Sequence, residues 1–162
     1  MPSNEPSSPF GQFLSFRVDG PVRKSDRSPM ALGVDYSFGY WVANNDALLL
    51  SAGLGPGLNF KKPIVPLLEL PLRATLMTPG ASVSLEFSPT LARYQGHTYA
   101  LGSVGIYYAL LYFFDFGFSA QVPLSSGVQK GEDWLRDVSL GLHVHLPVCL
   151  SRGRLHVRWG CL

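Results

Sequence analysis

The chain has 162 residues, which is the length of a single domain. Charged residues make up 15% of it, well below the roughly 25% of ordinary soluble domains. The formal net charge of +2 argues against a nucleic-acid partner. Hydrophobic residues reach 46%, yet no uninterrupted apolar run of about 18 residues exists, which argues against a transmembrane helix.

Residues 1–9 come first, and their polar, Pro- and Ser-rich sequence predicts a disordered tail. The segment has no basic start followed by an apolar stretch, so no secretory signal is visible in it. A two-residue alternation then recurs along the chain and predicts about eight strands. These strands cover Phe10–Asp19, Ala31–Val42, Ala47–Phe60, Ile64–Met77, Ala81–Tyr94, Thr98–Tyr112, Phe114–Leu124 and Trp134–Leu146.

The two alternating sets of residues differ in an unusual way. One set is bulky and apolar, whereas the other consists mostly of Gly, Ser and single charged residues. A period of two indicates a strand with two different faces. A water-facing sheet would carry many Lys, Glu and Thr residues on its polar face. The pattern therefore predicts an all-β fold, an up-and-down antiparallel β-barrel whose apolar face is turned outward to lipid.

Interior volume supports this orientation. A barrel of about eight strands encloses little more than side chains or one small ligand. The bulky set would overfill that space, whereas the Gly and Ser set fits easily. We therefore expect outward, exposed side chains at Phe116, Phe118, Leu140, Leu142 and Val144.

Prolines mark two irregular places in the predicted barrel. Pro66 and Pro71 lie in the fourth strand, which we expect to be irregular because proline removes a ladder hydrogen bond. Pro147 follows Leu146 and is expected to end the eighth strand. The barrel is therefore expected over residues 10–148.

Residues 149–162 form either an extension outside the barrel or an extra strand. Cys149 and Cys161 lie in this segment. The sequence is compatible with a disulfide between them and with two unpaired thiols.

Residues 114–146 resemble the closing hairpin of bacterial outer-membrane β-barrel proteins, including transporter-like families. The segment reads Phe-Asp-Phe-Gly-Phe-Ser-Ala-Gln-Val-Pro-Leu, then a polar loop, then Val-Ser-Leu-Gly-Leu-His-Val-His-Leu. The resemblance implies a small barrel in the bacterial outer membrane, with membrane lipid as its partner. Such proteins usually end on an aromatic residue in the last strand, whereas this chain continues past Leu146.

Charged and imidazole side chains on the small-residue face are expected to form a polar network in the lumen. The set comprises Asp35, Glu69, Arg73, Glu86, Asp115, Asp137, His143 and His145. Arg73 is expected to pair with a carboxylate, and Glu86 on the next strand is the expected partner, because an unpaired buried charge is unfavourable. The alternatives are a proton or solute path and an acid–base site.

No cofactor or metal is expected from the motifs. His143 and His145 share one face but have no third ligand near them in sequence. No Gly-x-Ser-x-Gly elbow, phosphate-binding loop or dinucleotide fingerprint occurs.

The sequence therefore predicts a non-enzymatic outer-membrane barrel with a structural or minor conduit role. A small solute is a candidate partner, and the oligomeric state stays open. Two alternatives are a soluble lipocalin-like barrel that binds a hydrophobic ligand and a lipid-modifying barrel enzyme. The enzyme would need Asp, His and Ser side chains that converge at one membrane interface.

Overall fold

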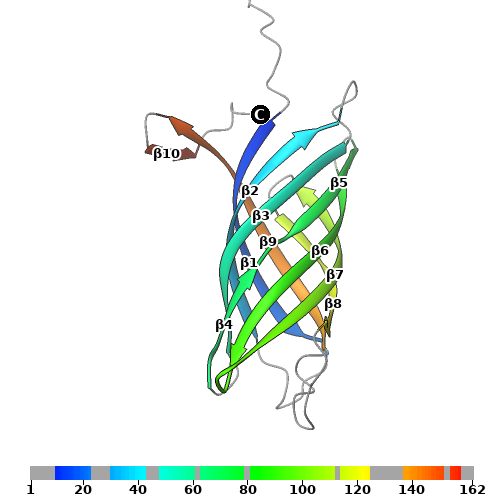
Figure 1. The fold of residues 1–162 in the computed structure, drawn as a ribbon. Helices are drawn as coiled ribbons and strands as arrows, with labels where there is room; N and C mark the ends of the chain where they lie inside the picture. The colour runs from blue at the N-terminus through cyan, green and yellow to red at the C-terminus, as the bar shows by residue number, and fades with distance from the viewer. Residues whose placement is uncertain are drawn as a thin grey trace, which may run out of the picture.

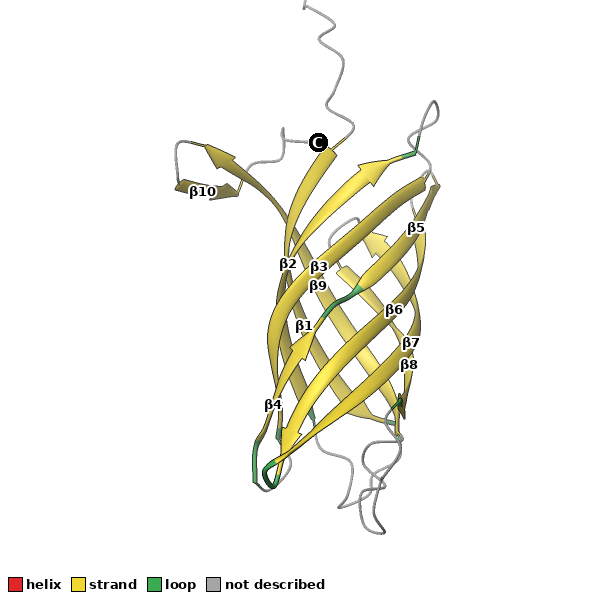
Figure 2. Ribbon diagram, viewed as in Figure 1, coloured by secondary structure: helices red, strands yellow, loops and turns green. Residues whose placement is uncertain are grey.

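A computed structural model describes the chain in eight segments. They are residues 10–22, 30–42, 48–60, 63–78, 81–111, 114–124, 137–151 and 154–157. Nearly all of this part is β-strand (Figure 2). No helix in it is long and apolar enough to cross a membrane. The predicted tail over residues 1–9 lies outside the described residues.

Ten strands follow one another in the described segments. They are β1 (Phe10–Pro21), β2 (Ala31–Trp41), β3 (Leu48–Asn59), β4 (Val65–Glu69), β5 (Leu72–Thr78), β6 (Ala81–Tyr94), β7 (His97–Leu111), β8 (Phe114–Pro123), β9 (Asp137–Ser151) and β10 (Arg154–Val157). Each predicted strand corresponds to an observed one within a few residues, apart from the fourth, which is divided, and the eighth, which is longer.

The sheet closes on itself because β1 pairs with both β2 and β9. All neighbouring strands are antiparallel, and β4 and β5 together occupy one strand position, so the barrel has eight strands (Figure 1). The predicted fold class, an up-and-down antiparallel barrel, is confirmed. Closure gives each strand of the barrel wall a neighbour on both sides over most of its length, which a sheet in lipid requires.

The division between β4 and β5 is a local interruption and not a change of register. Glu69 pairs with Thr90 of β6, and Leu72 pairs with Phe87, so the two short strands share one continuous alignment. Between them, Leu70 still donates its N–H to the Pro89 carbonyl at 2.9 Å. Proline at position 71 lacks a donor, which explains the interruption expected from the sequence.

The two ends of the barrel differ in their connections. Strands β1, β3, β6 and β8 end at one end of the barrel, called here the loop end; β1 begins and β9 ends at the other, called the termini end (Figure 1). At the loop end, Gln95 and Gly96 join β6 to β7 with φ values of 48° and 81°. Two consecutive positive φ values define the type I′ turn that suits the twist of a hairpin.

The apolar set of residues faces outward, as predicted. Phe118 is 54% exposed and Ile106 is 53% exposed, although both are large and apolar. Inward-facing Ser84 is 2% exposed. Phe116, Leu140 and Leu142 are likewise exposed, whereas Val144 on the same face is only partly exposed. This arrangement is the opposite of a soluble lipocalin-like barrel, whose apolar residues face the interior.

The last barrel strand is longer than predicted. β9 continues through Pro147 to Ser151, so the expectation that Leu146 ends it is wrong. The pairing of β9 with β8 stops at Val144, whereas its pairing with β1 continues to Pro147. Pro147 thus has a β1 neighbour on one side only, a position resembling a sheet edge, where proline is tolerated.

Strand β10 supplies the extra strand that the sequence left open. It pairs only with residues Val148–Ser151 of β9 and turns away from the barrel (Figure 1). Deleting residues 149–162 is expected to leave barrel folding unchanged, because every pair between β1 and β9 lies at or before Pro147. Refolding into detergent micelles, followed by a gel shift on heating, measures this. A truncated chain that fails to fold would show that β10 is needed for closure.

Candidate functional site

The lumen has three zones along its axis. At the termini end, Phe13 and Leu49 pack over Gly39, where a Cβ atom would meet both side chains. At the loop end, β4, β6 and β7 contribute a buried cluster that consists of Val65, Leu67, Ala92, Tyr94, Tyr99 and Leu101. Charged and imidazole groups occupy the middle, and these groups form the candidate site.

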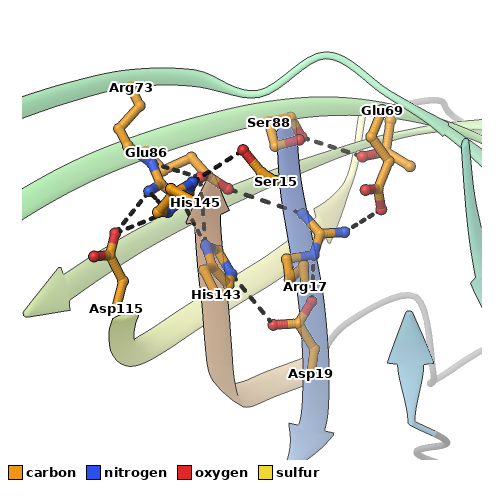
Figure 3. A network of polar contacts seen from close by, with 11 residues as sticks. Ser15, Arg17, Asp19, Glu69, Arg73, Glu86, Ser88, Asp115, His143 and His145 are labelled. Carbon is orange, nitrogen blue, oxygen red and sulfur yellow. Dashed lines mark hydrogen bonds and ion pairs between the residues drawn. The ribbon is translucent and has the colours of Figure 1, made fainter. Parts of the chain in front are cut away.

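Arg73 of β5 is the centre of the first half of the network (Figure 3). Its Nη2 atom lies 2.6 Å from Oε2 of Glu86 on β6, the residue directly opposite it in the hairpin. Its Nη1 atom lies 2.7 Å from Oδ2 of Asp115, which reaches it from β8. The expected pair of Arg73 and Glu86 is therefore present, and a second carboxylate joins it.

Arg17 of β1 is the centre of the second half. Its Nε atom lies 2.6 Å from Oδ2 of Asp19, and its Nη2 atom donates to Oε1 of Glu69. Its Nη1 atom lies 3.9 Å from Oε1 of Glu86. Glu86 thus stands between the two guanidinium groups and links the halves, as Figure 3 shows.

The two histidines of β9 extend the network. The Nδ1 atom of His143 lies 2.6 Å from Nη2 of Arg73. Its ring lies against that of Tyr107, with 4.2 Å between the centroids. Two residues further on, Nδ1 of His145 lies 2.9 Å from Oγ of Ser15, and its Nε2 lies 3.1 Å from Oδ2 of Asp115.

Sequence reasoning missed three large members of this network, besides Ser15. Arg17 and Asp19 share the inward face of β1 with Ser15, and that alternation was the signal that could have found them. Tyr107 is the third, and it is 2% exposed although it is large. Its position between small residues on the inward face of β7 was the available signal.

The remaining predicted residues have different positions. Asp35 lines the same cavity as Arg73 and Asp115. Asp137 begins β9, but its side chain lies outside the described residues. Among the described residues, no group of three or more His, Cys, Asp or Glu side chains has the arrangement of a metal site.

Glycines on the inward face provide the space that the large polar side chains fill. A Cβ atom on Gly105, Gly117 or Gly141 would meet the side chain of Tyr107. At Gly117 it would also overlap the carbonyl oxygen of Ile106. The small-residue face is therefore needed so that a few bulky charged and aromatic groups can fill the lumen.

Replacing Gly117 with alanine is expected to destabilise the barrel by about 1–3 kcal/mol, because the backbone of β7 must move to admit the methyl group. Gly20→Ala is the matched control, since no atom lies within 4 Å of a Cβ placed there. Urea unfolding in detergent micelles compares the two variants. Equal stabilities would contradict this tight packing.

Two small cavities lie on either side of the network. The one toward the termini end, of about 60 Å³, is lined by Arg73, Asp115 and His145 among others. The one toward the loop end, of about 40 Å³, is lined in part by Arg17 and Tyr107. A water molecule occupies roughly 10–15 Å³ by this measure. Each cavity therefore has room for only a few waters.

Ser15, His145 and Asp115 are the residue types of a nucleophilic triad. Two features oppose that role. Arg73 donates a hydrogen bond to Asp115 and contacts His145. The two groups that would orient and deprotonate the serine are therefore already bound to a guanidinium group. Ser15 is also buried, and the cavity beside it has no room for an ester substrate. The arrangement is a hydrogen-bonded part of the polar network.

Comparisons with known proteins give limited information. No family model matches the chain, and no curated protein does. A designed transmembrane β-barrel aligns with a TM-score of 0.43 and 12% identity, over 86% of this chain and 98% of that one. Neisserial surface protein A aligns with a TM-score of 0.37 and 17% identity, over 85% of this chain and 97% of that one.

Both TM-scores are low, so the class of protein rests on the barrel's own geometry. The barrel is closed, its outer face is apolar, and all but one of the charged side chains described in its wall point inside. Only helices and closed barrels satisfy every backbone hydrogen bond in lipid, and an outward apolar band with a polar interior defines the second kind. The chain is a small transmembrane β-barrel.

Proposed function

We propose that this protein is an integral barrel of the bacterial outer membrane with a structural role and a lumen closed to solutes. The observation that carries the proposal is the network around Glu86, which joins both arginines across the middle of the lumen. Ion pairs from β1, β5, β6 and β8 meet there. Buried charged side chains that pair with one another in this way fix the register of the strands and fill the interior of the barrel.

The lengths of the connections between strands also support one orientation of the barrel in the membrane. Outer-membrane barrels have short periplasmic turns and longer extracellular loops. The longest connections in this chain, residues 22–30 and 124–136, both join strands at the loop end. The proposal therefore places the loop end outside the cell and both termini in the periplasm.

Extraction and electrophoresis test the membrane part of the proposal. The protein is expected to need detergent for extraction and to migrate differently on a gel before and after heating, because the folded barrel resists the detergent in the gel. A monodisperse folded protein in plain buffer would contradict a membrane setting. Reconstitution into vesicles, followed by flotation, gives an independent measure.

Conductance tests the closed lumen. In a planar lipid bilayer, the wild-type protein is expected to give no steps of ionic current, because the two cavities are separated by ion pairs. Regular current steps from the wild-type protein would favour the minor conduit role instead. The same preparation must show the heat-dependent gel shift, so that an unfolded sample is not mistaken for a closed barrel.

An acyl-transfer role at Ser15 is tested with a fluorophosphonate probe, which labels activated serines. We expect no labelling, because His145 and Asp115 are held by Arg73. Labelling that disappears in a Ser15→Ala variant would contradict the structural role and support a lipid-modifying enzyme.

A further inference from the structure

Arg93 stands apart from the other charges of the barrel. Among barrel residues whose side chains the structure describes, it is the one charged residue on the outer face. The side chain is exposed near the loop end of β6, opposite Thr98 of β7. An arginine on the lipid-facing surface is tolerated near the headgroups and unfavourable at the middle of the bilayer. Arg93 therefore marks the headgroup level at the loop end.

A groove on the same outer face is lined by Leu91, two residues before Arg93 on β6. Its floor lies where β6 meets β7 and includes Pro89, Leu91 and Ala100, of which Leu91 pairs with Ala100. The side chain of Leu124 lies over Gly102, and its N–H donates to the Ala100 carbonyl at 2.7 Å. Small residues on β7 thus leave a depression that leucines surround.

The groove is larger than the two lumen cavities. It measures about 310 Å³, at the lower end of the roughly 300–1,000 Å³ of ligand sites. The leucines that surround it lie on β3, β4 and β6 and directly after β4 and β8, and they are Leu54, Leu68, Leu70, Leu91 and Leu124. Its exposed lining is almost entirely apolar.

The spacing between Arg93 and the groove suits the headgroup phosphate and the acyl chain of one lipid. Arg93 follows Leu91 by two residues on one strand, a separation of about 7 Å along the strand. A guanidinium group binds phosphate oxygens through two parallel hydrogen bonds. An apolar groove beside it accepts hydrocarbon, and the surrounding outer face already contacts the acyl chains of the membrane.

We propose that Arg93 and this groove bind one anionic lipid that carries a phosphate, with the phosphate on the guanidinium group and one acyl chain in the groove. This inference rests on the membrane setting of the proposed function and adds a specific lipid site to it. The positive charge of Arg93 favours an anionic headgroup. The groove is continuous with the lipid-facing surface, so an acyl chain of the membrane can occupy it.

Native mass spectrometry of the protein released from detergent micelles tests the site. The probes are phosphatidylglycerol and phosphatidylcholine with identical acyl chains. The wild-type protein is expected to bind its first phosphatidylglycerol roughly fivefold more tightly than phosphatidylcholine. Arg93→Gln should remove this preference, whereas Arg93→Lys should keep part of it, since the charge remains and the two-bonded geometry is lost.

A second pair of variants tests the groove itself. Ala100→Leu fills the floor and should weaken binding of both lipids, whereas Ala120→Leu, on the exposed outer face of β8, should change neither. An unchanged preference in Arg93→Gln would overturn the headgroup site, and unchanged binding in Ala100→Leu would overturn the chain site. A wild-type barrel that folds but shows no preference counts against this inference alone. A wild-type chain that does not fold in micelles counts against the proposed function.

Discussion

Replacing Arg73 with methionine is expected to lower the free energy of unfolding by about 3–5 kcal/mol, the usual effect of removing one partner from a buried ion pair. Methionine retains most of the side-chain volume and removes the charge. Glu86 and Asp115 then lose the guanidinium group that lies 2.6 and 2.7 Å from them. Both carboxylates are buried, so the few waters that fit in the adjoining cavity replace only part of the lost interactions.

Urea unfolding in detergent micelles, followed by tryptophan fluorescence, measures this change. Arg93→Met is the matched control, because it removes an arginine that is exposed on the outer face. We expect the control to change the free energy of unfolding by less than about 1 kcal/mol. Equal effects of the two substitutions would show that the lumen network does not stabilise the barrel.

The second large effect is expected on the outer face. Ile106 lies toward the middle of β7 and is 53% exposed. Ile106→Arg is expected to destabilise the barrel in a lipid bilayer by about 2–4 kcal/mol, because it places a charge near the centre of the hydrocarbon layer.

Val138 provides the comparison for Ile106. It is similarly exposed, at 50%, but lies one residue from the loop-end start of β9. Val138→Arg should therefore have a much smaller effect, about 0–1 kcal/mol, as expected near the headgroups. Unfolding in lipid vesicles measures both variants. If both tolerate arginine equally, this face does not contact the bilayer core.

Alternation along single strands was enough to predict the fold and the orientation of the side chains. A period of two assigns each residue to a face without knowledge of its neighbours, which explains why Phe118 was placed correctly on the outer face. The pair of Arg73 and Glu86 was also within reach, since these residues are directly opposite in one hairpin.

Contacts across the lumen could not be predicted in the same way. Asp115 reaches Arg73 from β8, and two strands separate β8 from β5 along the barrel wall. Such contacts depend on how far the strands are staggered when the barrel closes. The continuation of β9 past Pro147 was also beyond prediction. It depends on where the pairing between β9 and β8 ends, and the sequence of β9 alone does not specify that point.

The central claim is that the bulky face of each strand contacts lipid and the small-residue face lines the lumen. A cysteine scan along β8 tests it most directly, in a background where Cys149 and Cys161 are replaced by serine. A fluorescent label is placed in turn at five consecutive positions, Phe118, Ser119, Ala120, Gln121 and Val122, and brominated lipid chains serve as the quencher. The structure predicts strong quenching at the even-numbered positions and weak quenching at the odd-numbered ones. The opposite alternation, or none, would contradict the membrane-facing orientation of the barrel.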